Sequence, residues 1–127
     1  EYSTIWLGAM RRLYLKSGRL KQGTPILKSL SVNFAKNSRK DEWDSLTKAS
    51  RLVRGWGDCY GHILVATGRA EASFDPIMNP WDCGPLLPIM KEAEGTFTDW
   101  NGEATVYGKD AFSTNGFVFD EVMSLIG

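Results

Sequence analysis

The chain has 127 residues, a length that suits one domain with a substantial core. Hydrophobic residues make up 43% and charged residues 24%, and fifteen basic side chains balance fifteen acidic ones. This composition is typical of a globular protein, and the zero net charge argues against a nucleic-acid or membrane-surface protein that relies on bulk charge. No apolar run reaches the length of a membrane span.

The first 38 residues are expected to be mainly β structure. Lys16-Ser17-Gly18 is a turn signal, and residues 30–34 alternate apolar and polar side chains as a half-buried strand does. The predicted strands are residues 3–7, 13–15, 19–21 and 30–34.

After residue 38, helix-like and strand-like segments alternate, which indicates a layered α/β domain. Trp43 and Leu46 lie three positions apart and predict a helix from about residue 39 to 50. The other predicted helices are residues 60–67, residues 81–94 and a last helix after Asn115-Gly116. The predicted strands are residues 52–54, 72–74, 96–98, 105–107 and 112–114.

The helix of residues 60–67 is predicted to begin after Asp58, a good N-cap, and to stop at Gly68. The side chains expected on its inward face are Tyr60, Ile63, Leu64 and Thr67.

The helix of residues 81–94 contains two prolines. Pro85 is tolerated in or near the first turn, whereas Pro88 is expected to kink the helix or delay its regular start. Its inward side chains are predicted to be Leu86, Ile89, Met90 and Ala93.

Cys59 and Cys83 are the two cysteines, and no close pairing motif links them. Such usage is typical of reduced thiols, so we expect two small buried residues and a cytoplasmic location. A disulfide between them is the less favoured alternative.

Asp82 is the first candidate for chemistry, because it lies at the start of a predicted helix. The N–H groups and partial positive charge there stabilise a carboxylate and hold it in place, which suits Mg²⁺ ligation through oxygen. A plain helix-capping role is the alternative, and local sequence alone favours it.

Asp75 and the segment around Asp58 are the next candidates. Asp75 ends a strand before Pro76 and could accept hydrogen bonds from hydroxyl or ammonium groups, or simply form a turn. After Gly57, backbone N–H groups could face an anion, with Asp58 as an N-cap otherwise. Arg54 could pair with phosphate or with Asp58, or lie solvated at a strand end.

Other chemistry has little support in the sequence. His62, the single histidine, lies in mid-helix, where packing or surface positions are commoner than catalytic ones, and no Ser-His-Asp motif accompanies it. The glycines form neither a P-loop nor a dinucleotide fingerprint. The five tryptophans are interpreted as core and pocket lining, because no basic stripe accompanies them.

Several segments resemble the inositol monophosphatase family. The family's second signature, WDxAAxxxIxxEAGGxxTD, is matched by Trp81-Asp82, Pro88-Ile89-Met90, Glu92-Ala93 and Thr98-Asp99. Residues 54–61 (RGWGDCYG) and 65–71 (VATGRAE) resemble its histidinol-phosphate phosphatase branch, and residues 113–116 (STNG) are similar to the segment before its last helix. The resemblance is strong from Leu52 to Leu125 and loose before residue 50.

The resemblance implies a layered α-β-α sandwich, present as the C-terminal portion with part of the N-terminal sheet. Residues 1–50 would be a β-rich remnant plus a helix, and residues 51–127 the C-terminal α/β domain. The implied activity is Mg²⁺-dependent hydrolysis of a small phosphorylated substrate, histidinol phosphate, in histidine biosynthesis. Asp82 matches the family's metal-binding Asp, and Asp75 the acidic residue that contacts the non-phosphate part of the substrate. The residues that match the substrate-facing turn and a basic position near it are Gly57, Asp58, Cys59 and Arg54.

The family's first signature, DP(I/L)DGT, is absent from these residues, and with it further metal ligands. The resemblance therefore implies a missing N-terminal half, from the same precursor or another chain, and an inactive chain by itself. Glu94 replaces the first Gly of EAGG, and Cys83-Gly84-Pro85 replaces small residues. An inositol or nucleotide phosphate as substrate, a non-catalytic binding or assembly module, and a homodimer remain open alternatives.

Overall fold

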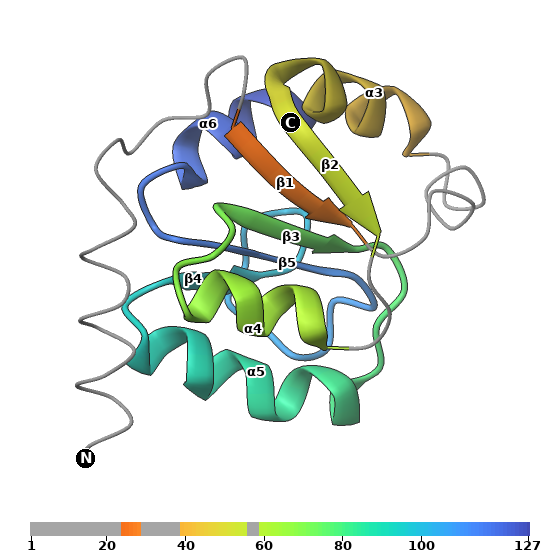
Figure 1. Cartoon of the computed structure of the whole chain (residues 1–127). Helices are drawn as coiled ribbons and strands as arrows, with labels where there is room; N and C mark the ends of the chain where they lie inside the picture. The colour runs from red at the N-terminus through yellow and green to blue at the C-terminus, as the bar shows by residue number, and fades with distance from the viewer. Residues whose placement is uncertain (1–23, 29–38, 56–58) are drawn as a thin grey trace.

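The computed structural model describes residues 24–28, 39–55 and 59–127 (Figure 1). The described helices are α3 (Lys40–Ala49), α4 (Tyr60–Ala66), α5 (Pro80–Glu92) and α6 (Phe119–Ile126). The described strands are β1 (Thr24–Lys28), β2 (Ser50–Gly55), β3 (Ala72–Asp75), β4 (Thr96–Thr98) and β5 (Ala111–Thr114). The strands predicted at residues 3–7, 13–15, 19–21 and 30–34 lie outside the described residues.

The five described strands form one mixed sheet in the order β2-β1-β3-β5-β4. β1 is parallel to both of its neighbours, β2 and β3. β5 is antiparallel to β3 on one side and to β4 on the other. The carboxyl end of β3, where Asp75 lies, therefore stands opposite Ala111 at the start of β5.

Helices cover both faces of the sheet, with α3 and α6 on one side and α4 and α5 on the other (Figure 1). This is the α-β-α sandwich that the sequence predicts. The core under α3 and α6 consists of Trp43, Leu46, Ala72, Phe74, Trp100, Phe112, Val118, Val122 and Ile126. The core under α4 and α5 consists of Val65, Ala66, Ala70, Met78, Cys83, Leu86, Met90, Ala93, Phe97 and Ala111.

Strand alternation supplies both cores from the same strands, because successive side chains point to opposite faces. Phe74 of β3 and Phe112 of β5 stack with ring centroids 5.5 Å apart on the α3/α6 face. Their neighbours Ser73 and Ser113 are buried yet polar. The opposite face of the central strands is therefore where polar groups enter the interior.

The predicted helices of residues 39–50 and 81–94 and the last helix are confirmed as α3, α5 and α6. Trp43 and Leu46 are buried, as their spacing indicates. The strand predicted at residues 105–107 is wrong, since this segment is irregular and the strand that pairs with β4 begins only at Ala111. β1 was not predicted.

The predicted details of α4 are partly wrong. Its N-cap is Cys59 rather than Asp58, and its buried residues are Gly61, His62, Val65 and Ala66. Tyr60 is exposed instead. Gly68 follows the helix with φ of 76°, the left-handed conformation expected of a helix stop, so this prediction is confirmed.

α5 begins at Pro80 and continues through both internal prolines, so the expected delay of its start at Pro88 is wrong, while the expected kink stays a prediction. A proline removes the N–H that would bond the carbonyl four residues earlier, here those of Trp81 and Gly84. These two residues and both prolines are exposed. Water can therefore bond the released carbonyls, and the helix continues past both prolines.

Three broader expectations can be compared with this fold. The boundary predicted at residue 50 falls at the first residue of β2, and strands from both sides of it share the sheet. The division into two parts stays a prediction. Cys59 and Cys83 are free thiols, as expected, but only Cys83 is buried, since Cys59 is half-buried. Among the described helices, none combines the length and apolar character needed to cross a membrane.

Candidate active site

Asp75 ends the central strand β3, and only 5% of its surface is exposed. Its Oδ2 atom lies 2.9 Å from Nε2 of His62 on α4. Over the described parts of the chain, no other hydrogen bond or ion pair to this carboxylate is recorded. The strand thus delivers a buried carboxylate with one oxygen bonded and the other left for a further donor.

His62 connects Asp75 to a second strand. Its Nδ1 atom is 2.8 Å from the Ser113 hydroxyl on β5, and its ring makes a T-shaped contact with Phe97 at a centroid distance of 5.5 Å. His62 and Ser113 are both 0% exposed. The three polar side chains form a buried chain between α4, β3 and β5, which we call the Asp75-His62-Ser113 chain.

The Asp75-His62-Ser113 chain contains the residue types of a nucleophilic triad but does not work as one. A catalytic serine must meet its substrate, and the buried hydroxyl of Ser113 is inaccessible. His62 is therefore buried and hydrogen-bonded rather than reactive, in line with the packing role expected from sequence. No local sequence pattern indicated the bond between His62 and Asp75. The small apolar pair Val65-Ala66, three and four positions after His62, was the signal for the true inward face of α4.

Asp82 lies in the first turn of α5, where the sequence placed it. Its Oδ2 atom accepts the backbone N–H of Asn79 at 3.3 Å and the Asn79 side-chain amide at 3.2 Å. The capping role is therefore present. Both bonds reach the same oxygen, and the side chain is partly exposed, so capping does not occupy the whole carboxylate.

The starts of α4 and α5 lie side by side. Cys59, the N-cap of α4, has its Sγ 3.9 Å from the backbone oxygen of Asp82. Burial, followed by the negative charges of Asp82, Cys59 and Asp75, raises the pKa of the Cys83 thiol to about 11. Cys83 belongs to the core under α4 and α5, and Cys59 packs against that core.

The remaining predicted residues are not brought into this cluster. Arg54 is exposed on β2, and its Nη1 donates to the carbonyl oxygen of neighbouring Val53 at 3.0 Å. Gly57 and Asp58 lie outside the described residues. The structure therefore places Cys59 beside Asp82, and Asp75 beside His62, which the prediction lacked.

The described residues contain no cluster of metal-ligating side chains. Within the ranges 24–28, 39–55 and 59–127, no three His, Cys, Asp or Glu side chains are grouped as a metal site requires. Asp82 offers one oxygen donor of the kind that Mg²⁺ prefers. Any metal centre would need further ligands from elsewhere.

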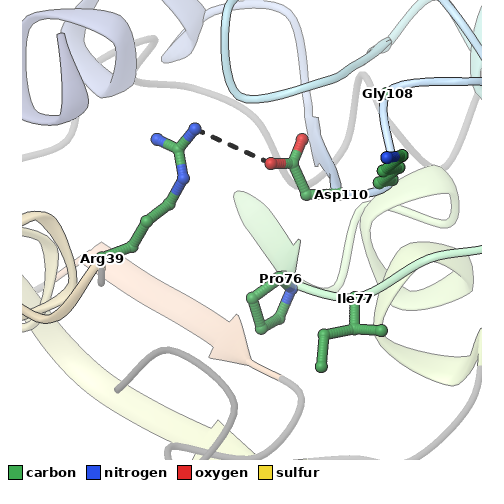
Figure 2. Close-up of a pocket in the computed structure, with 6 residues that line it drawn as sticks. Arg39, Pro76, Ile77, Gly108 and Asp110 are labelled. Atoms are coloured by element: carbon green, nitrogen blue, oxygen red, sulfur yellow. Dashed lines mark ion pairs between the residues drawn. The ribbon is translucent and has the colours of Figure 1, made fainter. Parts of the chain in front are cut away.

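A cavity of about 500 Å³ lies beside the strand end that carries Asp75. Figure 2 shows Arg39 directed toward Asp110, with their Nη2 and Oδ2 atoms 3.7 Å apart, across from Pro76 and Ile77. Burial raises the pKa of the Asp110 carboxyl, while the Trp100 N–H and the Arg39 charge oppose this shift. No sequence-predicted site residue lines the cavity.

Known proteins are similar to this chain in sequence and in architecture. The chain matches the inositol monophosphatase family over residues 3–121. It is 46% identical to a histidinol-phosphatase of Chlorobaculum parvum over 85 residues, covering 66% of this chain and 33% of that protein. It is 29% identical to a histidinol-phosphatase of Streptomyces coelicolor over 120 residues, covering 94% and 45% respectively.

The fold is also similar to the crystal structure of Staphylococcal IMPase-II. The TM-score is 0.73 at 26% identity, covering 86% of this chain and 42% of that one. Sequence and fold agree on one class, a layered α-β-α protein of the sugar-phosphatase type. The chain belongs to the inositol monophosphatase family. It spans a third to just under half of the length of the two histidinol-phosphatases.

Proposed function

We propose that the protein containing this chain is a cytoplasmic phosphomonoesterase that hydrolyses histidinol phosphate in histidine biosynthesis. This chain would form one wall of its active site. The observation that carries the proposal is the side-by-side arrangement of the starts of α4 and α5, where Cys59 Sγ lies 3.9 Å from the backbone oxygen of Asp82 and one carboxylate oxygen of Asp82 is not used in capping. Support for the substrate comes from the names of relatives, three of which are histidinol-phosphatases.

The roles proposed for the residues follow their places in the fold. Asp75 would accept hydrogen bonds from the hydroxyl or ammonium groups of the alcohol part of the substrate. Asp82 would give one carboxylate oxygen to Mg²⁺. A divalent ion bound there supplies positive charge for the phosphate and makes water a better nucleophile. The residues proposed to face the substrate from the neighbouring turn are Arg54, Gly57, Asp58 and Cys59.

One carboxylate does not fix a metal ion, so we propose that the other ligands belong to an N-terminal half. That half would come from the same precursor or from another chain, and a homodimer is one way to provide it. We expect the 127-residue chain alone to be inactive.

Phosphate release from histidinol phosphate in the presence of Mg²⁺ tests this proposal. The chain is assayed alone and after co-expression with the N-terminal portion of the Chlorobaculum parvum relative. We expect turnover only in the combined sample, and its loss in Asp82→Asn. Asn79→Ala, which disturbs the same helix start without removing a carboxylate, is the matched control and should stay active. Turnover by the chain alone would contradict the proposed incompleteness.

Two alternatives predict different results in the same assay. Solved structures of a staphylococcal relative contain 2′AMP or inositol monophosphate, so both compounds belong in the substrate panel. A higher kcat/KM for either would reassign the substrate. A non-catalytic binding or assembly module would associate with the N-terminal portion yet release no phosphate from any compound.

A further inference from the structure

We propose that His62 is a positioning residue that fixes the orientation of the Asp75 carboxylate, and that Ser113 in turn fixes the tautomer of His62. This inference rests on the proposed role of Asp75 in substrate binding. The Asp75-His62-Ser113 chain carries it, with contacts of 2.9 Å and 2.8 Å. Neither His62 nor Ser113 was among the residues that the sequence suggested for the site.

The hydrogen atoms of this chain can be assigned from the chemistry of its members. A carboxylate only accepts hydrogen bonds, so the ring atom that faces Asp75, Nε2, must carry a proton. In a neutral imidazole the other nitrogen is then an acceptor. A hydroxyl can donate a hydrogen bond, so the Ser113 O–H donates to Nδ1. Every group in the chain is satisfied by the neutral Nε2–H form of the ring.

This arrangement leaves Asp75 in one orientation. Oδ2 is bonded to His62, which itself contacts Ser113 and the ring of Phe97. Oδ1 is then the oxygen available to a ligand. A carboxylate held in advance needs no reordering when a donor arrives, which strengthens binding of that donor.

The substrate class follows from what remains of the carboxylate. An oxygen acceptor at the end of β3 selects phosphate esters whose alcohol part bears a hydroxyl or ammonium donor. This acceptor adds no binding energy for an ester whose alcohol part lacks a hydroxyl or ammonium donor. His62 should therefore affect affinity for donor-bearing substrates more than the hydrolysis step itself.

An NMR experiment on the 127-residue chain tests the hydrogen assignment without any activity. The chain has one histidine, so a two-bond ¹⁵N–¹H spectrum of its imidazole contains a single spin system. At neutral pH we expect the Nε2–H tautomer, and in Ser113→Ala a mixture of tautomers. Thr96→Val is the matched control, because it removes a hydroxyl bonded to Thr114 and leaves His62 untouched. An Nδ1–H tautomer, or an unchanged spectrum in Ser113→Ala, would overturn the assignment.

Kinetics of the completed enzyme test the positioning role. His62→Leu removes the donor to Asp75, and His62→Gln offers an amide donor in its place. We expect His62→Leu to raise KM for histidinol phosphate about tenfold more than KM for 4-nitrophenyl phosphate, the factor for one lost hydrogen bond to a charged group. His62→Gln should recover part of this difference.

If His62 had only a structural role, His62→Leu would raise KM for both substrates by the same factor, and that result would overturn the inference. If His62→Leu does not fold, Ser113→Ala takes its place and should show the same selectivity with a smaller effect. The two proposals fail separately. An inactive completed enzyme with the expected NMR tautomer would refute the proposed function, whereas an active enzyme without selective KM changes would refute the role of His62.

Discussion

Asp82 combines two possible roles on one side chain, and its neighbour Asn79 allows them to be separated. Asp82→Ala removes the acceptor of both Asn79 contacts, so we expect the free energy of unfolding to fall by about 1 kcal/mol. Asn79→Ala should lower the free energy of unfolding by a similar or smaller amount. Urea denaturation measures both. Loss of activity in the completed enzyme should follow Asp82→Ala alone, and equal activity in the two variants would reduce Asp82 to a cap.

Cys83 and Cys59 should differ in reactivity although both are free thiols. Cys83 is 1% exposed, and the pKa of its thiol is raised to about 11, whereas Cys59 is half-buried. We expect a chromogenic disulfide reagent at pH 8 to modify one thiol in the folded chain and the second only after unfolding. Cys59→Ser should abolish the fast reaction. If Cys83→Ser abolished it instead, the proposed burial would be wrong.

The same pKa shift has a consequence for stability at alkaline pH. The folded state holds the thiol proton more tightly than the unfolded state, whose ordinary value is 9.0. The contribution of the neutral Cys83 thiol is therefore fully present below pH 9 and is lost as the pH rises through about 11. Cys83→Ala should lack this alkaline decline in urea denaturation.

At the level of residues, the sequence predicted where a side chain lies within its helix or strand better than which other side chains it contacts. Local patterns placed Asp75 at a strand end and Asp82 at a helix start, because strand and cap signals extend over only a few residues. His62 lies 13 positions from Asp75 and 51 from Ser113, so no local pattern links them. The substrate-binding and metal-binding roles of Asp75 and Asp82 stay predictions.

The end of α5 shows how an element accommodates an unusual residue. Glu94 follows the C-cap residue Ala93 with φ of 59°, in the left-handed region that glycine prefers. It stands where the family signature has the first Gly of EAGG. The backbone can therefore end this helix as a glycine would, but with a side chain that disfavours the conformation.

Glu94→Gly should therefore stabilise the chain. Removing the Cβ from a left-handed position is expected to raise the free energy of unfolding by about 1 kcal/mol. Glu94→Ala is the control, because it removes the charge and the side-chain contacts but keeps the Cβ. Thermal or urea denaturation of both variants decides the matter. An equal gain in Glu94→Ala would show that charge, not backbone conformation, causes the effect.

Two missed elements have identifiable physical causes. β1 contains Pro25, and a proline argues against a central strand because it has no N–H for the ladder. β1 is nevertheless central, with a register irregularity between Thr24 and Pro25. The strand predicted at residues 105–107 was inferred from an Asn-Gly turn. In the structure, Asp99 Oδ1 accepts the N–H groups of Asn101 and Glu103, both at 2.9 Å, and closes a different loop.

At the scale of the whole described fold, the Phe74 ring contacts aromatic side chains from several elements. It stacks on Phe112 and meets Trp43 and Trp100 edge-on at centroid distances of 6.5 Å and 5.6 Å. These contacts connect α3, two strands and the loop after β4. The core under α3 and α6 therefore depends on one ring at the centre of the sheet.

Phe74→Ala should accordingly weaken the entire fold rather than one helix. We expect the free energy of unfolding to fall by about 3–5 kcal/mol, the usual effect of emptying a buried phenylalanine site. Tyr107→Ala, at a side chain that is 76% exposed, should change it by less than about 0.5 kcal/mol. Fluorescence and circular dichroism should report one shared transition. A small loss in Phe74→Ala would contradict the central place of this ring.

A layered α/β domain was predictable from the alternation of helices and strands, and the family resemblance implied the α-β-α sandwich that the solved relatives share. Strand order was not predictable, because the sheet pairs β3 with β1 and β5, which are distant along the chain. An incomplete candidate site was expected from the absent first signature, and this incompleteness stays a prediction. The ligands that would complete it stay a prediction.

The position of β1 limits how the chain can be shortened. A polypeptide that starts at residue 51 would keep every residue resembling the second signature but would lose the strand between β2 and β3. The backbone N–H and C=O groups of β3 that pair with β1 would then form an open edge. Such an edge pairs readily with the same edge of another molecule. The shortened polypeptide would therefore collect as insoluble aggregates, and any expression trial of this region should begin before Thr24.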